Sequence, residues 1–320
     1  MPALLSVTNL RTSFPSHQGE IDAVHGVSLT LDRGAVLALV GESGSGKSMT
    51  ALSIMRLVPP PGLISSGEIV FEGRNLPALT EEEMRLVRGR RISMVFQEPM
   101  TSLNPVLRIS DQLSEPLILH SGLSRREALD KGVALLTEVG IPSAGDRMRD
   151  YPHQLSGGMR QRVMIAMALA CNPALLIADE PTTALDVTIQ AQILELLDSL
   201  RKSAGLAMLL ITHDLGIVSE RSDHTSVMYA GQIVESAPTK MLLTNPQHPY
   251  TQALLASLPQ YAEPGKPLKT VAAQMTGIKM DSTGCSFAGR CPIASGNCFS
   301  DTQHLQEIEP YHSVRCWKCQ

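Results

Sequence analysis

Long apolar runs are absent from this chain of 320 residues. The two longest, 35–40 and 174–178, fall far short of the roughly 18 consecutive apolar residues that a membrane-spanning helix requires. Residues 1–10 also lack the basic region, the apolar region and the cleavage site of a secretory signal. We therefore expect the chain to stay in the cytosol, where disulfides are rare.

An excess of one charge is also missing. The 27 Lys and Arg residues nearly balance the 31 Asp and Glu residues, and the basic ones are dispersed. Without a basic stripe, we expect no nucleic-acid partner. Aromatic residues make up only 3% of the chain, so most of them should be needed for packing. What is present is a hydrophobic content of 43%, enough at this length for one large domain with an insertion or appendage.

Apolar runs followed by a turn and a helical pattern recur along the chain. They lie at 35–40, 92–96, 175–178 and 207–212. This rhythm is typical of a parallel α/β sheet covered by helices, in which ligands gather at the carboxyl ends of the strands. Alternating patterns predict an antiparallel β layer beside it, with strands at 4–10, 23–31, 67–72 and 226–235.

The strand signals stop between about 100 and 155. Segment 124–139 has helical spacing there, and Ser124 with Glu127 three residues later forms a capping-box pattern. We therefore predict a helical insertion. After residue 247 the composition turns to Pro, Gly, Cys and polar residues, and 263–267 resembles a flexible joint. These features predict a small unit of its own.

The eight residues after the first apolar strand match the phosphate-binding loop. Its glycines let backbone N–H groups point inward at an anion, the lysine reaches the β- and γ-phosphates, and the last serine ligates Mg²⁺. The strand before it and the helix expected from about Met49 disfavour a chance Gly/Ser turn. The loop consists of Gly41, Glu42, Ser43, Gly44, Ser45, Gly46, Lys47 and Ser48.

Polar residues follow the other apolar strands. Asp179 and Glu180 come directly after 175–178, where Asp179 suits a Mg²⁺ role and Glu180 can polarise the attacking water. His213 follows 207–212, within expected reach of the γ-phosphate, and Gln97 follows 92–96, where its amide can contact Mg²⁺ or water. Each residue alone would be ordinary, but the phosphate loop favours the catalytic interpretation.

A second anion-binding pattern begins at Ser156. This residue is a natural helix cap, and Gly157 and Gly158 allow close approach to a phosphate. One ATP does not require two such sites in one chain. We infer that the second serves an ATP held by a partner subunit, although a purely structural capped helix is the alternative.

In this order the features resemble those of ATP-binding cassette proteins, over residues 4 to about 246. The resemblance implies ATP and Mg²⁺ as cofactors, with Ser48, Gln97 and Asp179 around the metal. Phe14 is the nearest aromatic residue that could stack on adenine, and core packing is its alternative role. The family's motifs fall on 41–48 (Walker A), Gln97 (Q-loop), 155–158 (signature), 175–179 (Walker B), Glu180, Asp186 (D-loop) and His213 (switch).

The resemblance also implies a fold and a domain division. The fold is α/β, a P-loop NTPase with a RecA-like parallel sheet, an antiparallel β layer, a helical subdomain and a small Cys-rich extension. The ATPase core would comprise 1–98 and 156–245, the helical subdomain 99–155, and the extension 246–320.

Segments 97–105, 151–162 and 245–255 are similar to those of oligopeptide, dipeptide and nickel importers. This resemblance implies a second related ATPase, two transmembrane permease subunits, an extracytoplasmic substrate-binding protein, and a place on the cytoplasmic face of the membrane. Peptides and nickel chelates both remain open as solutes. A soluble cassette ATPase is a rival, yet such chains generally carry two cassettes. A regulatory cassette would lack Lys47, Glu180 or His213.

Five of the six cysteines fall in the last 36 residues. Cys285, Cys291, Cys298 and Cys316 are separated by 5, 6 and 17 residues, and four thiolates suit an iron–sulfur cluster or zinc. Resemblance to the peptide importers favours a [4Fe–4S] cluster with a structural or docking task apart from hydrolysis. Zinc or no metal are alternatives. Cys319 would be a spare ligand, and the sixth cysteine, at 171, a small buried residue.

Overall fold

The computed structural model describes residues 2–17, 19–98, 102–183, 185–258 and 284–319. The chain divides into two compact units. Unit 1 comprises Met1–Leu4, Leu31–Ala35 and Asn75–Ile211, and unit 2 comprises Leu5–Thr30, Val36–Arg74 and Thr212–Gln320. In the described part of the chain, no helix combines the length and the apolar character needed to cross a bilayer.

Unit 1 is built on parallel strands in the order β8 (Ala207–Thr212), β7 (Leu175–Asp179) and β6 (Ile92–Val95). Every residue of the three strands is buried, which explains their unbroken apolar sequences. The predicted parallel strands are confirmed. Two of the strand ends differ from the prediction by one residue. Phe96, which is 37% exposed, lies outside β6, whereas Asp179 belongs to β7.

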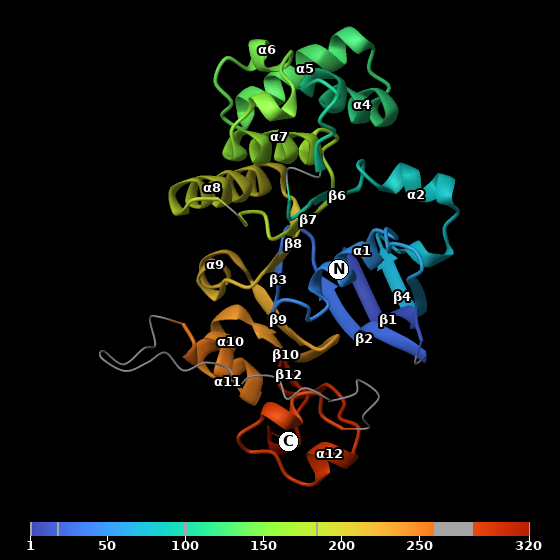
Figure 1. Cartoon of the computed structure of the whole chain (residues 1–320), viewed down its shortest axis with the longest axis vertical. Helices are drawn as coiled ribbons and strands as arrows, with labels where there is room; N and C mark the ends of the chain where they lie inside the picture. Colours follow the sequence, from blue (N-terminus) through green and yellow to red (C-terminus); the bar gives the residue numbers. More distant parts are fainter. Residues whose placement is uncertain (1, 18, 99–101, 184, 259–283, 320) are drawn as a thin grey trace. The chain divides into compact units, whose positions relative to one another are not determined.

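The predicted helical insertion is also present in unit 1 (Figure 1). Its longest helix, α5, begins after Ser124, whose hydroxyl accepts from the backbone N–H of Glu127 while the Glu127 carboxylate accepts from the N–H of Ser124. The predicted capping box is thus confirmed. The helices of unit 1 whose residues the structure describes are η1 (Leu76–Ala78), α2 (Glu81–Val87), α4 (Ile109–Ser121), α5 (Arg125–Glu138), α6 (Ala144–Arg147), η2 (Pro152–Gln154), α7 (Gly157–Leu169) and α8 (Val187–Ala204).

Unit 2 contains the antiparallel layer. Its strands lie in the order β2 (Gly19–Leu31), β1 (Leu5–Ser16), β4 (Leu63–Phe71) and β5 (Arg74–Asn75), and all but the short β5 were expected from alternating sequence. β1 and β4 are antiparallel partners. Helix α1 (Lys47–Ile54) is tied to β1 by the hydroxyls of Thr12 and Ser53, 2.7 Å apart.

The expected strand at 226–235 was assigned to the wrong sheet. These residues form a hairpin of β9 (His224–Tyr229) and β10 (Gln232–Pro238), and β9 runs parallel to β3 (Val36–Val40). The Ala230–Gly231 turn has positive φ at both positions, as tight hairpins require. Five of the six residues of β9 are buried, so the polar Thr225 and Ser226 do not mark a solvent-facing side.

The described part of the extension continues this second sheet. Strand β12 (His312–Val314) pairs with β10, and β11 (Gln306–Glu309) pairs with β12. The other elements of unit 2 are helices α9 (Leu215–Arg221), α10 (Thr239–Thr244), α11 (Pro249–Ala256), η4 (Ala288–Arg290), α12 (Asn297–Ser300) and η5 (Trp317–Cys319).

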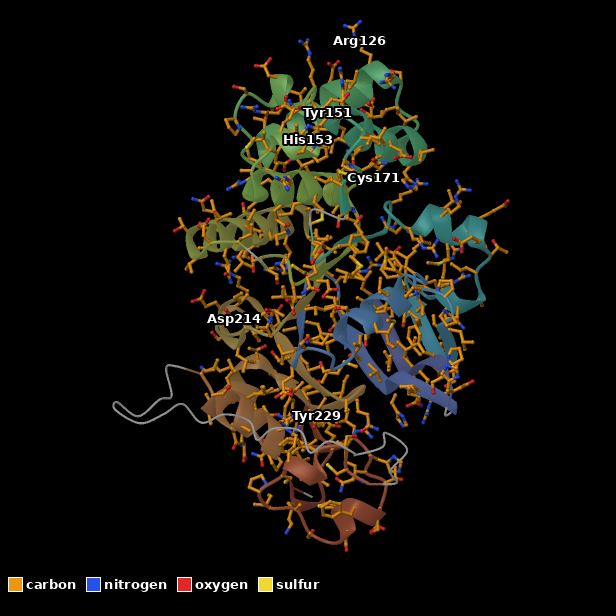
Figure 2. The ribbon with its side chains drawn as sticks, in the orientation of Figure 1. Arg126, Tyr151, His153, Cys171, Asp214 and Tyr229 are labelled. Carbon is orange, nitrogen blue, oxygen red and sulfur yellow. The ribbon has the colours of Figure 1, made fainter. Side chains whose placement is uncertain are left out.

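The extension also shares a hydrophobic core with the strands. The Phe287 ring lies 5.3 Å from that of Tyr229 and 5.4 Å from that of Tyr250, between centroids. Figure 2 labels Tyr229, which comes from β9. The sequence predicted a separate small unit, whereas this part of the chain packs inside unit 2. The predicted joint at 263–267 lies outside the described residues.

A buried carboxylate fastens the extension to the sheet. Glu235 on β10 is fully buried and accepts hydrogen bonds from the backbone N–H groups of Gln247 and His248, at 2.8 and 2.9 Å. The Nε2 atom of His312 on β12 lies 2.8 Å from the same carboxylate. Burial lowers the pKa of His248 to about 4, so its neutral Nδ1 accepts the N–H of Tyr250.

Replacing this carboxylate should destabilise unit 2. We expect Glu235→Ala to lower the free energy of unfolding by roughly 3–5 kcal/mol, because buried donors and a buried imidazole lose their partner. Denaturant titration measures the change. The control is Glu309→Ala, which removes an exposed carboxylate from neighbouring β11. Equal midpoints for the two variants would show that Glu235 has no such role.

Candidate nucleotide site

The phosphate loop of unit 2 connects β3 to α1 and packs tightly against other backbone segments. A Cβ atom on Gly41 would lie 2.2 Å from the carbonyl oxygen of Met228, and one on Gly46 would lie 2.5 Å from the carbonyl oxygen of Ala23. No other residue type fits at these two positions. The loop conformation therefore depends on glycines, as the sequence predicted.

Lys47 lies across this loop. Its side chain is only 4% exposed, and Nζ donates to the carbonyl oxygens of Gly41 and Glu42 at 2.8 and 2.9 Å. The opposite side of the loop is fixed by the N–H of Gly231, which donates to the carbonyl oxygen of Ser45. The contact of Lys47 with the β- and γ-phosphates stays a prediction.

Glu42 makes two contacts that the sequence did not predict. Its backbone N–H donates to the Tyr250 hydroxyl at 2.9 Å, and its carboxylate accepts two hydrogen bonds from the Arg290 guanidinium, at 2.9 and 3.0 Å. The Glu42–Arg290 pair joins residues 248 positions apart, so no local pattern indicates it. The only sequence signals were that Tyr250 lies in the importer-like segment and that Arg290 precedes Cys291.

Unit 1 brings together a second group of polar side chains. The Glu180 carboxylate accepts a hydrogen bond from the Gln97 amide at 3.1 Å and one from the Thr183 hydroxyl at 2.8 Å. Gln97 and Glu180 were both predicted, whereas Thr183 was not. Asp179, at the end of β7, is 5% exposed.

The backbone of Glu180 is strained. Its φ angle is +44°, a conformation rare outside glycine, and its N–H donates to the carbonyl oxygen of Ile211 at 2.9 Å. Such strain persists where the surrounding structure fixes the residue, and it is concentrated at functional sites. The positive φ angle therefore sets the direction of the Glu180 side chain directly after the buried strand β7.

His213 and Asp214 follow β8 and belong to unit 2. His213 is exposed, and Asp214, labelled in Figure 2, caps α9 by accepting from the N–H groups of Gly216 and Ile217. The cap explains why the chain turns into a helix immediately after the strand. The γ-phosphate role of His213 stays a prediction.

The signature residues of unit 1 lie at the start of α7. Leu155 is buried, and the exposed Ser156 caps the helix by accepting from the N–H of Met159 at 3.3 Å. Gly157 is exposed, and Gly158 lies so close to Ile189 that a Cβ atom would be 2.9 Å from its side chain. The structure thus has a Ser-capped helix start here, and its role as an anion site stays a prediction.

Two other predicted residues contact neighbours that give them a structural role. Asp186 is exposed and caps α8 by accepting from the N–H of Ile189. The Phe14 ring is half-buried and lies against Gly62, where a Cβ atom would be 2.4 Å from the ring. The contact accounts for one face of the ring. The adenine-stacking role of Phe14 stays a prediction.

The four predicted cysteine ligands line one pocket of unit 2 together with Phe287. Cys298 and Cys316 are buried, and neither they nor Cys285 and Cys291 form a disulfide. Burial raises the pKa of Cys285 to about 11 and also raises that of Cys291. A group with positive charge is therefore needed to hold thiolates here.

Among the described residues, no group of three or more His, Cys, Asp or Glu side chains has an arrangement that could hold a metal ion. The side chain of Cys319 lies outside the described residues. Cys171, predicted to be buried, is half-buried in unit 1, and burial raises the pKa of its thiol.

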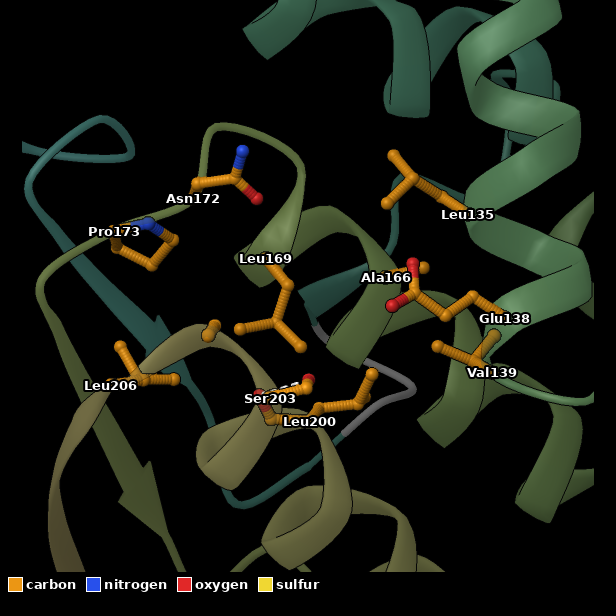
Figure 3. Close-up of a pocket in the computed structure, with 11 residues that line it drawn as sticks. Leu135, Glu138, Val139, Ala166, Leu169, Asn172, Pro173, Leu200, Ser203 and Leu206 are labelled. Atoms are coloured by element: carbon orange, nitrogen blue, oxygen red, sulfur yellow. Dashed lines mark hydrogen bonds between the residues drawn. The ribbon is translucent and has the colours of Figure 1, made fainter. Parts of the chain in front are cut away.

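A different pocket lies in unit 1 among α5, α7 and α8 (Figure 3). Leucine and alanine side chains dominate it, and of the described residues that line it Glu138 alone is titratable. A surface of this kind offers no cradle for phosphates. No pattern in the sequence predicts this pocket.

Comparisons with known proteins agree with the motifs. The family model described as ABC transporter matches residues 24–183, and one described as the C-terminal region of oligopeptide/dipeptide transporters matches residues 234–298. The chain belongs to the ABC transporter ATPases.

Its relatives match along nearly their whole length. A protein of Brucella melitensis, provisionally named a peptide import ATP-binding protein, is 51% identical over 99% of this chain and 97% of its own. The oligopeptide transport protein OppD of Bacillus subtilis is 48% identical over 98% of this chain and 88% of its own. The dipeptide transport protein DppD of the same organism is 46% identical over 99% and 95%.

Solved ABC cassettes share the fold. A dimeric cassette bound to ADP and Pi matches with a TM-score of 0.66 and 28% identity, covering 73% of this chain and 98% of the other. The cassette cbiO1 of Clostridium perfringens matches with a TM-score of 0.64 and 27% identity, covering 77% and 92%. The predicted P-loop NTPase fold is confirmed.

The geometry of Glu180 leads to a kinetic prediction. We expect Glu180→Gln to retain ATP binding and to lower the hydrolysis rate roughly 10²–10⁴-fold, because an amide cannot orient water as a carboxylate does. Steady-state phosphate release and nucleotide titration measure the two effects. Lys47→Ala should instead weaken nucleotide binding.

The control for this prediction is Glu195→Gln, which changes an exposed carboxylate on α8 of the same unit. It should hydrolyse ATP at the wild-type rate. Equal turnover of Glu180→Gln and wild type would remove Glu180 from its catalytic role.

Proposed function

We propose that this chain is the ATP-hydrolysing subunit of an importer and couples Mg-ATP hydrolysis to the uptake of di- or oligopeptides. The observation that carries the solute class is the match of residues 234–298 to the C-terminal region of oligopeptide/dipeptide transporters. Full-length relatives named for peptide transport support it. An importer of nickel chelates is the alternative, and a soluble cassette ATPase is a more remote one.

We propose the nucleotide roles that the sequence motifs indicate. The loop from Gly41 to Ser48 binds the phosphates with its N–H groups and Lys47, while Ser48, Gln97 and Asp179 surround Mg²⁺. Glu180, held by Gln97 and Thr183, orients the attacking water. His213 acts on the γ-phosphate, and Phe14 stacks on adenine.

The partner of this cassette is a second, related ATPase. The start of α7, with Ser156, Gly157 and Gly158, binds a phosphate of the ATP held by that partner, and Asp186 of the D-loop also takes part in nucleotide binding. The presence of two anion-binding helix starts in one chain supports this arrangement. Two transmembrane permease subunits and an extracytoplasmic binding protein complete the importer, with this chain peripheral on the cytoplasmic face of the membrane.

We propose the same domain boundaries that the family resemblance implies. Residues 1–98 and 156–245 form the ATPase core, 99–155 form the helical subdomain, and 246–320 form the extension.

We further propose that the cysteine pocket holds a [4Fe–4S] cluster. Four cysteines outside any disulfide line one pocket, which fits the ligand number of such a cluster. The four cysteines are separated by 5, 6 and 17 residues in the sequence, whereas zinc sites favour pairs separated by about two to four residues. This spacing favours a cluster over zinc. When bound, the cluster supplies the positive charge that the thiolates need.

The solute is tested by ATPase stimulation in the reconstituted complex. We expect the binding protein loaded with short peptides to raise ATP turnover in proteoliposomes, because solute binding outside is coupled to hydrolysis inside. Loading with a nickel chelate should leave turnover at its basal rate. Stimulation by the chelate and not by peptides would overturn the peptide assignment.

The cluster is tested by chemical analysis of anaerobically purified protein. We expect a brown protein with about four irons and four sulfides per chain, and a partial or complete loss of both in Cys291→Ser. Cys171→Ser, which removes a thiol from unit 1, should retain the full cluster. A colourless protein with stoichiometric zinc, or without metal, would overturn the proposal.

A further inference from the structure

The ion pair between Glu42 and Arg290 is the most unusual contact of the phosphate loop. Arg290 comes from η4 of the extension, and its side chain is only 6% exposed. Its guanidinium donates two hydrogen bonds to the Glu42 carboxylate and one to the Tyr229 hydroxyl at 3.3 Å, and it lies over the Tyr229 and Phe287 rings. A planar group held on so many sides is a rigid partner.

The ion pair neutralises a negative charge within the phosphate loop. Glu42 places a carboxylate within a segment whose function is to bind phosphate anions. Its side chain is 36% exposed, so solvent screens the charge only in part. The guanidinium of Arg290 neutralises that carboxylate and holds it in one place. Without Arg290, a negative charge would remain at the entrance of an anion site, where it repels phosphates.

A second contact from the C-terminal side acts on the same residue. The Tyr250 hydroxyl, from α11, accepts the backbone N–H of Glu42. The Tyr250 ring is fully buried and packs against Tyr229 and Phe287, so the hydroxyl has a fixed position. Backbone and side chain of Glu42 are therefore both held by residues that follow β10 in the chain.

The turn that carries Arg290 is bounded by two cysteines of the pocket. The N–H of Ala288 donates to the carbonyl oxygen of Cys285, and the N–H of Cys291 donates to that of Ala288, at 2.9 and 3.2 Å. Phe287 from the same turn lines the pocket. Because the turn spans only five residues between the two thiols, a change in the position of either cysteine moves Arg290.

We propose that Arg290 and Tyr250 are positioning residues of the ATP site, and that Arg290 couples the state of the cysteine pocket to ATP affinity. The coupling rests on the ATPase function and on occupancy of the pocket, as proposed above. It revises the expectation that the cysteine cluster has a task apart from hydrolysis. Arg290 acts on the loop through Glu42, the loop residue whose carboxylate it contacts.

A double-mutant cycle on the full-length protein tests the ion pair. We expect Arg290→Ala to weaken ATP binding roughly tenfold, because it unpairs a charged hydrogen-bonding group. In steady-state kinetics the KM for ATP should rise while kcat stays nearly constant. Glu42→Gln combined with Arg290→Ala should recover most of the affinity, because the repelling carboxylate is gone. Arg290→Lys, which retains the charge, should lie in between.

The recovery separates positioning from folding. Glu42→Gln cannot refold a damaged extension, so additive losses in the double variant would overturn the electrostatic role of Arg290. Tyr250→Phe should weaken binding less than Arg290→Ala, because it removes one neutral hydrogen bond. Lys240→Ala removes an exposed cation from α10 of the same unit and should bind ATP as wild type does. If Lys240→Ala weakened ATP binding as much as Arg290→Ala does, the loss would reflect the net charge of the unit and not the ion pair with Glu42.

A second cycle tests the link to the pocket in anaerobically purified full-length protein. We expect Cys291→Ser to weaken ATP binding severalfold when Arg290 is present and to change it less than about twofold in an Arg290→Ala background. Equal effects in both backgrounds, or none in either, would overturn the coupling. Failure of wild-type protein to bind ATP would instead refute the ATPase assignment itself, so the two failures are distinguishable.

Discussion

Backbone atoms of neighbouring segments leave no room for side chains at two positions of the phosphate loop, so the loop can form only with glycine there. The carbonyl oxygens of Met228 and Ala23 lie where Cβ atoms at Gly41 and Gly46 would be. The loop therefore requires glycine at both positions to fit beside β9 and the segment at Ala23. This requirement makes the parallel pairing of β3 with β9, and the tight turn at 230–231, part of the site.

In unit 1 the corresponding constraint is the placement of the Glu180 carboxylate. Glu180 follows a fully buried strand and adopts a positive φ angle that glycine alone tolerates readily. Hydrogen bonds from Gln97 and Thr183 fix its carboxylate. The free-energy cost of the strained backbone is offset by the surrounding contacts, an arrangement that favours preorganised chemistry over maximal stability.

Local sequence predicted those features that depend on neighbouring residues. The capping box at Ser124 and the strand ending at Thr212 were both expected from short patterns, and both are present. Strand β9 was assigned to the wrong sheet, because a fully buried strand that contains Thr and Ser looks like an alternating one. The contacts of Glu42 with Tyr250 and Arg290 join distant positions, and no periodicity or spacing encodes such a pair. Thr183 was missed for a simpler reason, since a threonine after Walker B carries no distinctive pattern.

The contacts of Glu42 have a thermodynamic consequence for the extension. If the extension stabilises the loop in the conformation that binds ATP, then bound ATP must stabilise the extension by the same free energy, because binding linkage is reciprocal. A cassette that opens and closes its nucleotide site in each cycle would then raise and lower the stability of the turn between Cys285 and Cys291 in each cycle. The rings of Tyr229, Tyr250 and Phe287, whose centroids lie 4.7 to 5.4 Å apart, pack between that turn and the loop contact of Tyr250. On this argument bound ATP and an occupied cysteine pocket stabilise each other.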